Sequence, residues 1–336
     1  MDNPTHFDAL LVVSFGGPEG MDDVMPFLEN VLRGRNVPRE RMLAVAKHYE
    51  LFDGVSPINE QNRKLIAALE LELKTHGLHL PIYFGNRNWH PLLADTLEQM
   101  RADGITNALA FVTSAYSSYS SCRQYLEDIE RARERVGAGA PRVEKLRPFF
   151  NHPGFIEANG ENVQAALDQI GAACRGETRV LFTAHSIPQS MANNSDYVLQ
   201  LEEASRLVAG AIGLKHWRLV FQSRSGSPTQ PWLGPDVCES LRELYESGTR
   251  DVVIAPIGFV SDHMEIVYDL DTEALALCRE LGLNMVRAAT AGTHPKFVAM
   301  IRELILERTE PGTLRRSLGN LGRCADTCAP GCCSMK

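Results

Sequence analysis

Residues 9–20 read Ala-Leu-Leu-Val-Val-Ser-Phe-Gly-Gly-Pro-Glu-Gly, a short apolar run that leads into a glycine-rich loop. Such a run, bounded by turn residues, is typical of a strand buried on both faces of a parallel sheet. Similar runs at 81–84 and 108–113 flank a helical segment that begins near Pro91 and stops at Gly104. The first part of the chain therefore predicts βαβ units around one parallel sheet.

The second part of the chain repeats this order of strand, loop and helix. Strands are predicted at 179–183, 218–222, 251–256 and 284–288, and helices at 197–211, 241–246, 264–281 and 297–307. We expect an α/β protein with two doubly wound, Rossmann-like domains on parallel sheets, at 1–145 and 146–311. The last helix is free to pack back on the first domain, and the cysteine-rich segment 312–336 forms a short tail.

Charge and hydropathy exclude several classes of partner. The chain carries 34 Lys and Arg against 42 Asp and Glu, a formal net charge of −8. This balance gives no reason to expect nucleic acid, and at most peripheral contact with a membrane. No apolar run approaches the roughly 20 residues of a transmembrane helix. Residues 1–6 show no basic segment followed by an apolar one, so we expect a cytoplasmic protein.

Several common motifs are absent. The sequence contains no Walker A motif, no G-x-G-x-x-G after a strand and no G-x-S-x-G. His263-Met-Glu265 matches the H-x-E of zinc deaminases, but the partner motif P-C-x-x-C is missing. Nucleotide-binding, serine-hydrolase and deaminase functions are therefore disfavoured together.

Ionisable residues follow two buried strands, at the edge where α/β sheets bind ligands. His185 follows the strand 179–183, although a core or turn histidine explains it equally well. Glu265 follows the apolar stretch 257–260 and starts a row with Asp269 and Glu273 at four-residue spacing. The row predicts three carboxylates on one helical face, about 6 Å apart per step. It is either a solvated acidic stripe or, because it starts among apolar residues, a path for a cation or protons.

Other loops suit a flat ligand with polar edges. The stretch 114–125 combines serines with tyrosines such as Tyr125, and it reads equally well as a serine-rich turn. Residues 85–89, Arg33 and Arg35 supply cations and amides for carboxylates, although the two arginines also fit a solvated turn.

Several of these stretches together make the sequence resemble the ferrochelatases, the enzymes that insert Fe²⁺ into a porphyrin late in haem synthesis. The matching stretches are Leu10-Leu-Val-Val-Ser-Phe-Gly-Gly-Pro-Glu-Gly20, Gly54-Val-Ser-Pro-Ile-Asn59, Phe182-Thr-Ala-His-Ser-Ile-Pro188, Gln222-Ser-Arg-Ser-Gly226, Pro231-Trp-Leu-Gly-Pro235 and Gly258-Phe-Val-Ser-Asp-His-Met-Glu265. They occur in the family's order from residue 10 to about 271. The resemblance implies a chelatase-type fold.

The resemblance also implies a catalytic pair. His185 matches the histidine of the family's signature motif, and Glu265 matches the carboxylate that faces it across the porphyrin cleft. Both would contact the Fe²⁺ substrate, and Asp269 and Glu273 match the acidic row that leads away as a metal or proton path.

Other matched positions imply porphyrin contacts. Ser56 and Tyr125 fall where the family contacts the porphyrin. Phe15 stands where other members carry a tyrosine, so that hydroxyl is missing here. We include Phe15, Arg33 and Arg35 among the expected porphyrin contacts.

The implied reaction suits these residue types. A free-base porphyrin loses two N–H protons as the metal enters. A neutral imidazole can accept a proton or present Fe²⁺ at neutral pH, and a carboxylate can accept or relay the second proton. Which of the two groups is proton acceptor and which is metal donor stays open.

The porphyrin is expected to be coproporphyrin III, which would give coprohaem. The compact segment 33–39 resembles the short bacterial members that use this porphyrin more than the apolar lip of membrane-associated members. The alternatives are protoporphyrin IX, a cobalt or nickel chelatase, and a non-catalytic haem or porphyrin carrier, which would need neither proton acceptor. Expected partners are the porphyrin, Fe²⁺ and other enzymes of the haem pathway.

Half of the eight cysteines fall within ten residues near the C-terminus. In a reducing compartment, clustered thiols indicate metal or cluster ligands. Some ferrochelatases hold a [2Fe–2S] cluster with one internal and three C-terminal cysteines, so the resemblance implies the same here. The expected ligands are Cys122, Cys328, Cys332 and Cys333, with Cys324 as a substitute and Cys174 as a weaker internal candidate; the alternative is a disordered tail that binds adventitious metal.

Overall fold

The computed structural model describes residues 6–34, 37–171, 176–225, 229–329 and 331–334. Two four-stranded parallel sheets organise the chain, with strand orders β2-β1-β3-β4 and β6-β5-β7-β8. The first sheet contains β1 (Ala9–Ser14), β2 (Ile82–Asn86), β3 (Asn107–Val112) and β4 (Arg142–Lys145); the second contains β5 (Arg179–His185), β6 (Trp217–Gln222), β7 (Asp251–Ala255) and β8 (Asn284–Arg287). The predicted α/β fold with two parallel sheets is confirmed.

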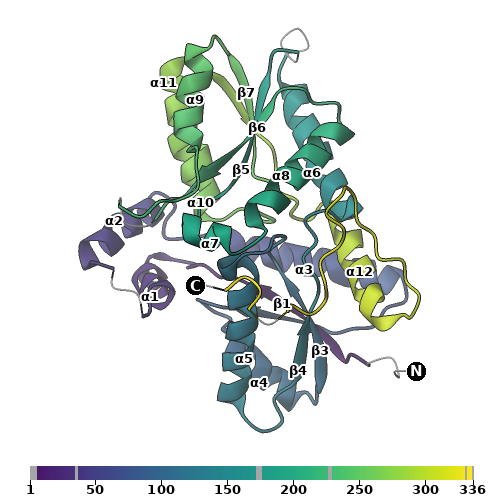
Figure 1. Cartoon of the computed structure of the whole chain (residues 1–336). Coiled ribbons are helices and arrows are strands. Elements are labelled where there is room, and N and C mark those ends of the chain that lie inside the picture. The colour runs from purple at the N-terminus through teal and green to yellow at the C-terminus, as the bar shows by residue number, and fades with distance from the viewer. Residues whose placement is uncertain (1–5, 35–36, 172–175, 226–228, 330, 335–336) are drawn as a thin grey trace.

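Helices cover both sheets and separate them (Figure 1). In chain order they are α1 (Met21–Val31), α2 (Arg39–Glu50), α3 (Ile58–Thr75), α4 (Leu93–Ala102), the π-helical turn η1 (Tyr119–Arg123), α5 (Gln124–Val136), α6 (Pro153–Gln169), α7 (Gln189–Asn193), α8 (Tyr197–Ala211), α9 (Val237–Glu246), α10 (Met264–Val267), the π-helical turn η2 (Asp269–Ala274), α11 (Leu275–Leu281) and α12 (Pro295–Thr309). The described helices include none that is both long and apolar enough to span a bilayer.

Two local predictions were incomplete. The segment 142–145, where no strand was predicted, is the edge strand β4, whose polar residues pair with β3. The single helix predicted over 264–281 is interrupted by η2, where Glu273 N–H bonds Tyr268 O, five residues earlier, at 2.9 Å. The Thr272 hydroxyl donates to Val267 O at 2.9 Å and occupies a carbonyl of the preceding turn, which accounts for the wider turn.

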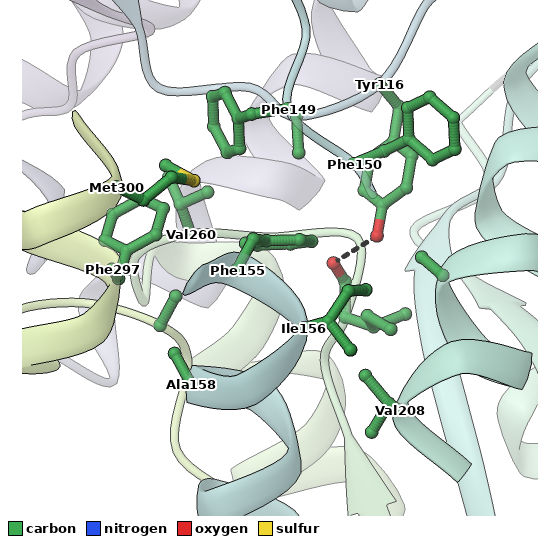
Figure 2. Packing of buried hydrophobic residues seen from close by; sticks show 14 of the residues in the cluster. Tyr116, Phe149, Phe150, Phe155, Ile156, Ala158, Val208, Val260, Phe297 and Met300 are labelled. Carbon is green, nitrogen blue, oxygen red and sulfur yellow. Dashed lines mark hydrogen bonds between the residues drawn. The ribbon is translucent and has the colours of Figure 1, made fainter. Parts of the chain in front are cut away.

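One continuous core joins the two halves. Phe111 of β3 stacks on Phe149 at 5.4 Å between ring centroids, and Phe149 meets Phe155 of α6 edge-on at 5.5 Å. Phe297 of α12 packs on the same group (Figure 2). Helix α12 contacts both α3 and α6, so it bridges elements from the two parts of the chain.

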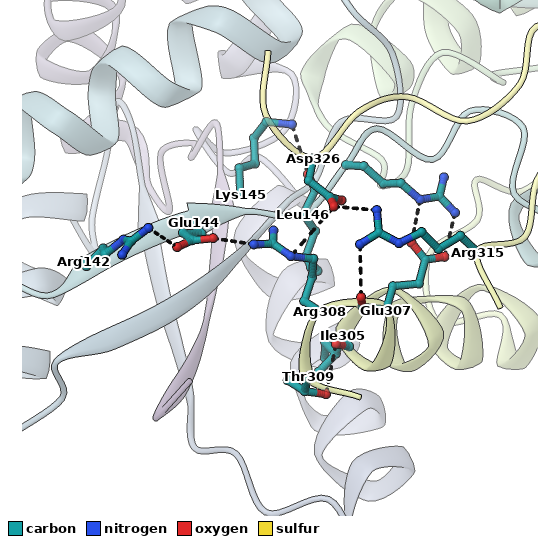
Figure 3. Close-up of polar contacts among 11 residues, drawn as sticks. Arg142, Glu144, Lys145, Leu146, Ile305, Glu307, Arg308, Thr309, Arg315 and Asp326 are labelled. Atoms are coloured by element: carbon teal, nitrogen blue, oxygen red, sulfur yellow. Dashed lines mark hydrogen bonds and ion pairs between the residues drawn. The ribbon is translucent and has the colours of Figure 1, made fainter. Parts of the chain in front are cut away.

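A buried ion pair fixes α12 to the segment that links the sheets. Arg147 Nε and Nη2 donate to the two carboxylate oxygens of Glu307 at 2.7 and 2.8 Å, and both side chains are almost completely buried. The surrounding charges form further pairs (Figure 3). This bidentate geometry holds α12 in one register against the linking segment.

The tail after α12 contains no helix or strand among its described residues and crosses the molecule to the start of α5 (Figure 1). Asn151 Nδ2 donates to Leu318 O at 3.0 Å and to Gly322 O at 2.7 Å. Asp326 accepts from Arg315 at 2.6 Å. The tail is therefore tied to the folded body by specific polar contacts.

Candidate active site

His185 and Glu265 meet at the carboxyl edge of the second sheet. His185 is the last residue of β5, and Glu265 lies in the first turn of α10, after the loop that follows β7. His185 Nε2 lies 3.1 Å from Glu265 Oε1. Two residues 80 positions apart in the sequence thus meet within hydrogen-bonding distance.

The backbone brings the two loops close together. Gly258 N–H donates to Thr183 O at 2.9 Å. A Cβ atom on Gly258 would lie 2.6 Å from Ala184 Cα, a distance that only glycine permits. Glycine at this position therefore allows the loop after β7 to approach the end of β5.

Two neighbours hold His185, one at its ring and one at its backbone. Its Nδ1–H donates to the Ser186 carbonyl, which directs Nε2 at Glu265. Tyr197 of α8 donates its hydroxyl to His185 O at 3.1 Å. The position of Tyr197 in the sequence, on an amphipathic helix, gives no hint of this contact.

Charge within the pair is strongly polarised. Burial disfavours the imidazolium form of His185, but the facing Glu265 carboxylate outweighs burial and raises the pKa of His185 to about 9. Burial likewise opposes ionisation of Glu265, yet His185 and then His263 lower the pKa of that carboxyl to about 2. Without substrate at neutral pH, the pair therefore consists of an imidazolium with a proton on Nε2 as well as Nδ1 and an ionised Glu265.

Glu265 is positioned from both sides. His263 caps α10, because its Nδ1 accepts from Glu265 N–H at 3.2 Å, and its Nε2 lies 3.8 Å from Glu265 Oε2. Gln222, at the end of β6, donates to the Glu265 carbonyl. In the sequence, His263 was considered only as part of the deaminase motif. Its position two residues before Glu265 is the signal that indicates its capping role.

The other two acidic residues of the row, Asp269 and Glu273, lie in the π-helical turn η2 and not in one regular helix with Glu265. Asp269 is half-buried and accepts from the Ser223 hydroxyl, while Glu273 is exposed. Burial raises the pKa of Asp269 to about 7, with Glu265 and Glu273 adding to the effect and Ser223 opposing it. Ser223 adopts φ 62°, a left-handed conformation that costs about 1 kcal/mol in a non-glycine residue. That conformation accompanies the hydrogen bond to Asp269.

The expected porphyrin contacts lie in different environments. Phe15 follows β1 and is 37% exposed, with its ring edge-on to Phe27 at 6.3 Å. Arg33 is exposed and donates to Asn30 in the last turn of α1, whereas Arg35 lies outside the described residues. Phe15 and Arg33 are thus accessible on the side of the molecule formed by α1 and the loop after β1.

Ser56 and Tyr125 are buried. Ser56 packs against the Gly17 backbone, where an added Cβ would lie 2.6 Å from the serine Cβ. Tyr125 is covered by the Arg87 guanidinium, 4.4 Å from the ring centroid. Arg87 in turn pairs with Asp128, so this arginine of the loop 85–89 is engaged within the protein.

The helices α1 and α2 connect this side to the catalytic pair. Their apolar residues, Phe27 and Tyr49 among them, pack with Met264 of α10, the residue directly before Glu265. His48 of α2 also stacks on Tyr268 at 3.7 Å between ring centroids. Phe15, which meets Phe27 edge-on, is therefore connected by packing to the residue before Glu265.

The cysteines gather at a second place, on the first half of the molecule. Cys122, at η1, donates a hydrogen bond to the Cys328 sulfur, and this bond together with burial raises the pKa of Cys122. The same bond lowers the pKa of Cys328, although burial acts in the opposite direction there. Cys332 Sγ lies 3.6 Å from Cys333 Sγ, and Cys332 also contacts Cys328. Cys324 instead accepts from Gln200 Nε2 at 3.6 Å, and Cys174 lies outside the described residues.

No preformed metal cage is present among the described residues: nowhere do three or more His, Cys, Asp or Glu side chains stand in ligating positions around one point. The thiols nevertheless fit an iron–sulfur cluster by donor chemistry, because four of them contact one another in sequence and Cys122 is supplied by the folded body.

Comparison with solved structures defines the class of fold. The sirohydrochlorin chelatase SirB from Bacillus subtilis subspecies spizizenii, in complex with cobalt, matches with a TM-score of 0.52 at 14% identity, over 90% of this chain and 96% of that chain. SirB from Bacillus subtilis with Fe³⁺ matches with a TM-score of 0.54 at 16% identity, over 90% and 95%. At these identities the likeness establishes the fold, which is that of the chelatases.

Sequence comparison is more specific. The ferrochelatase family model matches residues 7–309. The ferrochelatase of Rhodopirellula baltica is 60% identical over 97% of this chain and 93% of its own length. The coproporphyrin III ferrochelatase of Streptomyces coelicolor is 50% identical over 98% of this chain and 94% of its own length. The chain belongs to the ferrochelatase family and is a metal chelatase that inserts Fe²⁺ into a porphyrin in haem biosynthesis.

Proposed function

We propose that the porphyrin substrate is coproporphyrin III and that His185 and Glu265 carry out the insertion. The observation that supports the roles of the two residues is their 3.1 Å contact at the strand ends, with one proton shared by the pair. The porphyrin assignment is supported by relatives about 50% identical over nearly the whole chain that are named for this substrate. The exposed Arg33 offers a cation for its propionates.

The proposed reaction exchanges two pyrrole protons for one Fe²⁺. The porphyrin nitrogens form bonds to iron as their N–H bonds break, and the two protons leave through the protein. Glu265 is ionised and can accept the first pyrrole proton at once. His185 can accept the second only after its own Nε2 proton has left along the acidic row to solvent. Insertion therefore requires that the contact between His185 and Glu265 break. The entering metal or porphyrin would break it by binding between the two side chains.

The acidic row serves as the exit for these protons. Asp269 has a pKa of about 7, so it can both take up and release a proton near neutral pH. It stands between the half-buried Glu265 and the exposed Glu273, which interact with it electrostatically. The row ends at the exposed Glu273, from which a proton can pass to solvent.

A [2Fe–2S] cluster is proposed on the second group of residues. Cys122, Cys328, Cys332 and Cys333 would hold it, with Cys324 as a substitute. When bound, such a cluster accepts and donates single electrons. Metal insertion transfers no electron, so the proposal assigns the cluster no step in that reaction.

The remaining assignments concern organisation and location. Segments 1–145 and 146–311 are proposed as the two domains and 312–336 as the cysteine-rich tail. A cytoplasmic location is proposed because clustered free thiols persist in reducing compartments. Contact with membranes is at most peripheral, and contact with other haem-pathway enzymes is proposed.

The test is anaerobic Fe²⁺ insertion with coproporphyrin III and protoporphyrin IX side by side. We expect a higher kcat/KM for coproporphyrin III. An equal or higher value for protoporphyrin IX would overturn the substrate assignment. Binding of either porphyrin without any turnover would instead favour the carrier.

A further inference from the structure

The first turn of helix α3 contacts the carboxyl edge of the first sheet. Asn59, in that turn, is completely buried and donates through Nδ2 to Gly17 O at 3.2 Å and to His90 O at 3.1 Å. Its Oδ1 accepts from Asn86 Nδ2 at 3.0 Å. Gly17 follows β1, and His90 follows β2, so one side chain of α3 holds both loops that leave these strands.

These loops carry the expected porphyrin contact Phe15. Asn88 donates its backbone N–H and its side-chain amide to Phe15 O, both at 3.1 Å. Ile58, also in the first turn of α3, presses on the loop after β1, because a Cβ on Gly17 would lie 2.9 Å from Ile58 Cγ2. The position of Phe15 is therefore tied to the position of α3.

The same turn of α3 reaches the second half of the chain. Gln61 Oε1 accepts from Asp262 N–H at 2.7 Å, across 201 positions of sequence. Within the second half, Arg287 Nη2 donates to the Asp262 carboxylate at 3.0 Å. Asp262 directly precedes His263, whose ring accepts from Glu265 N–H. Gln61 thus joins the first half to the segment that carries Glu265.

Packing does not fill the space beside this hydrogen bond. A cavity of about 380 Å³ lies there, lined by Gln61 and Lys64 of α3 on one side and by Asp262 and residues of the segment 287–293 on the other. Side chains separated by such a gap make no dispersion contacts across it. At this edge of the cavity, the bond from Asp262 to Gln61 therefore sets the separation of α3 and the loop after β7.

We propose that Asn59 and Gln61 are positioning residues for metal insertion, which together set the distance between the Phe15 loop and Glu265. The inference rests on the proposed function, in which Phe15 contacts the porphyrin and Glu265 accepts its proton. Residues two positions apart on a helix point to different sides of it, so α3 links the two sides of the site. Spacing matters because a misplacement of about 1 Å can cost about 100-fold in rate.

The experiment compares anaerobic Fe²⁺ insertion by full-length variants. Gln61→Met removes the acceptor at nearly constant size, and Gln61→Glu keeps an acceptor oxygen. Lys64→Met is the control, because Lys64 lines the same cavity and forms only an exposed ion pair with Glu60 at 3.6 Å. His185 is titrated by NMR in each variant, since this titration reports the geometry of the catalytic pair without turnover.

We expect kcat to fall about five- to tenfold in Gln61→Met, as for the loss of one hydrogen bond. Gln61→Glu and Lys64→Met should keep a kcat near that of the wild type, and the His185 titration should stay unchanged throughout. An unchanged kcat in Gln61→Met, or an equal loss in Gln61→Glu, would overturn the role of Gln61. A shifted His185 titration in Gln61→Met would also overturn it, because the change would then lie within the catalytic pair.

A second comparison tests the link through α3. Asn59→Leu should also lower kcat, and the double variant with Gln61→Met should lose no more than the larger single loss, because either change frees the same spacing. Losses that multiply would overturn the link, and the Gln61 series decides alone if Asn59→Leu does not fold. Near-wild-type turnover in His185→Ala would overturn the proposed catalytic roles and this inference with them, whereas failure of the Gln61 series alone would overturn only the spacing.

Discussion

Replacement of Glu265 by glutamine should change the protonation state of His185. The glutamine side chain keeps the size of the carboxylate but carries no charge. Burial, which opposes the imidazolium form, remains in the variant. We therefore expect the pKa of His185 to fall from about 9 to below its ordinary value near 6.5.

The expected size of the effect follows from the pair itself. A difference of roughly 2.5 pKa units corresponds to about 3 kcal/mol. The Glu265 side chain is 42% exposed, so solvent screening reduces the coupling to about 1–2 kcal/mol. Because the folded-state pKa of His185 is raised, this stabilisation is present below pH 6.5 and is lost as the pH rises through about 9.

The assay is a pH titration of histidine side chains by NMR in ¹⁵N-histidine-labelled protein. A His185→Asn variant identifies the relevant resonance by its disappearance. Urea unfolding at several pH values supplies the second readout, and the wild type should lose its advantage over Glu265→Gln between pH 6.5 and 9.5. A His185 resonance that still titrates near pH 9 in Glu265→Gln would refute the argument, since some other group would then hold the proton.

Four further outcomes are expected. His185→Ala should abolish Fe²⁺ insertion with an unchanged circular dichroism spectrum, and near-wild-type turnover would contradict the mechanism. Glu265→Gln should lower kcat far more than porphyrin affinity, and a parallel loss of affinity would mean that Glu265 holds the ring. Cys122→Ser should remove the red-brown colour and the bound iron and sulfide. The control Cys238→Ser, at a free cysteine of α9, should keep them. A coloured Cys122→Ser chain would exclude Cys122 as a ligand. Glu307→Gln should lower the free energy of unfolding in urea by about 3–5 kcal/mol, because it leaves a buried guanidinium without its anion, and a loss below about 1 kcal/mol would show that the pair is not buried in solution.

Much of the framework was readable from local patterns. Apolar runs such as 9–13 indicated parallel strands because a strand covered on both faces needs apolar residues throughout. The edge strand β4, with the sequence Arg-Val-Glu-Lys, was not predicted, because it is polar and pairs on one side only. The π-helical turn η2 was also not predicted, because the periodicity of side chains does not reveal it. Its extra residue accompanies a hydrogen bond from the Thr272 hydroxyl.

The sequence by itself determined that His185 and Glu265 follow buried strands and that thiols cluster near the C-terminus. Strand ends can be located from composition because burial selects residue types locally. Only the tertiary structure decided that His185 faces Glu265, that Tyr197 and His263 bond the backbone of these two residues, and that the tail brings its cysteines to Cys122. These contacts join residues far apart in the chain or depend on side-chain direction, and their energies depend on distance and burial, which a linear pattern does not contain.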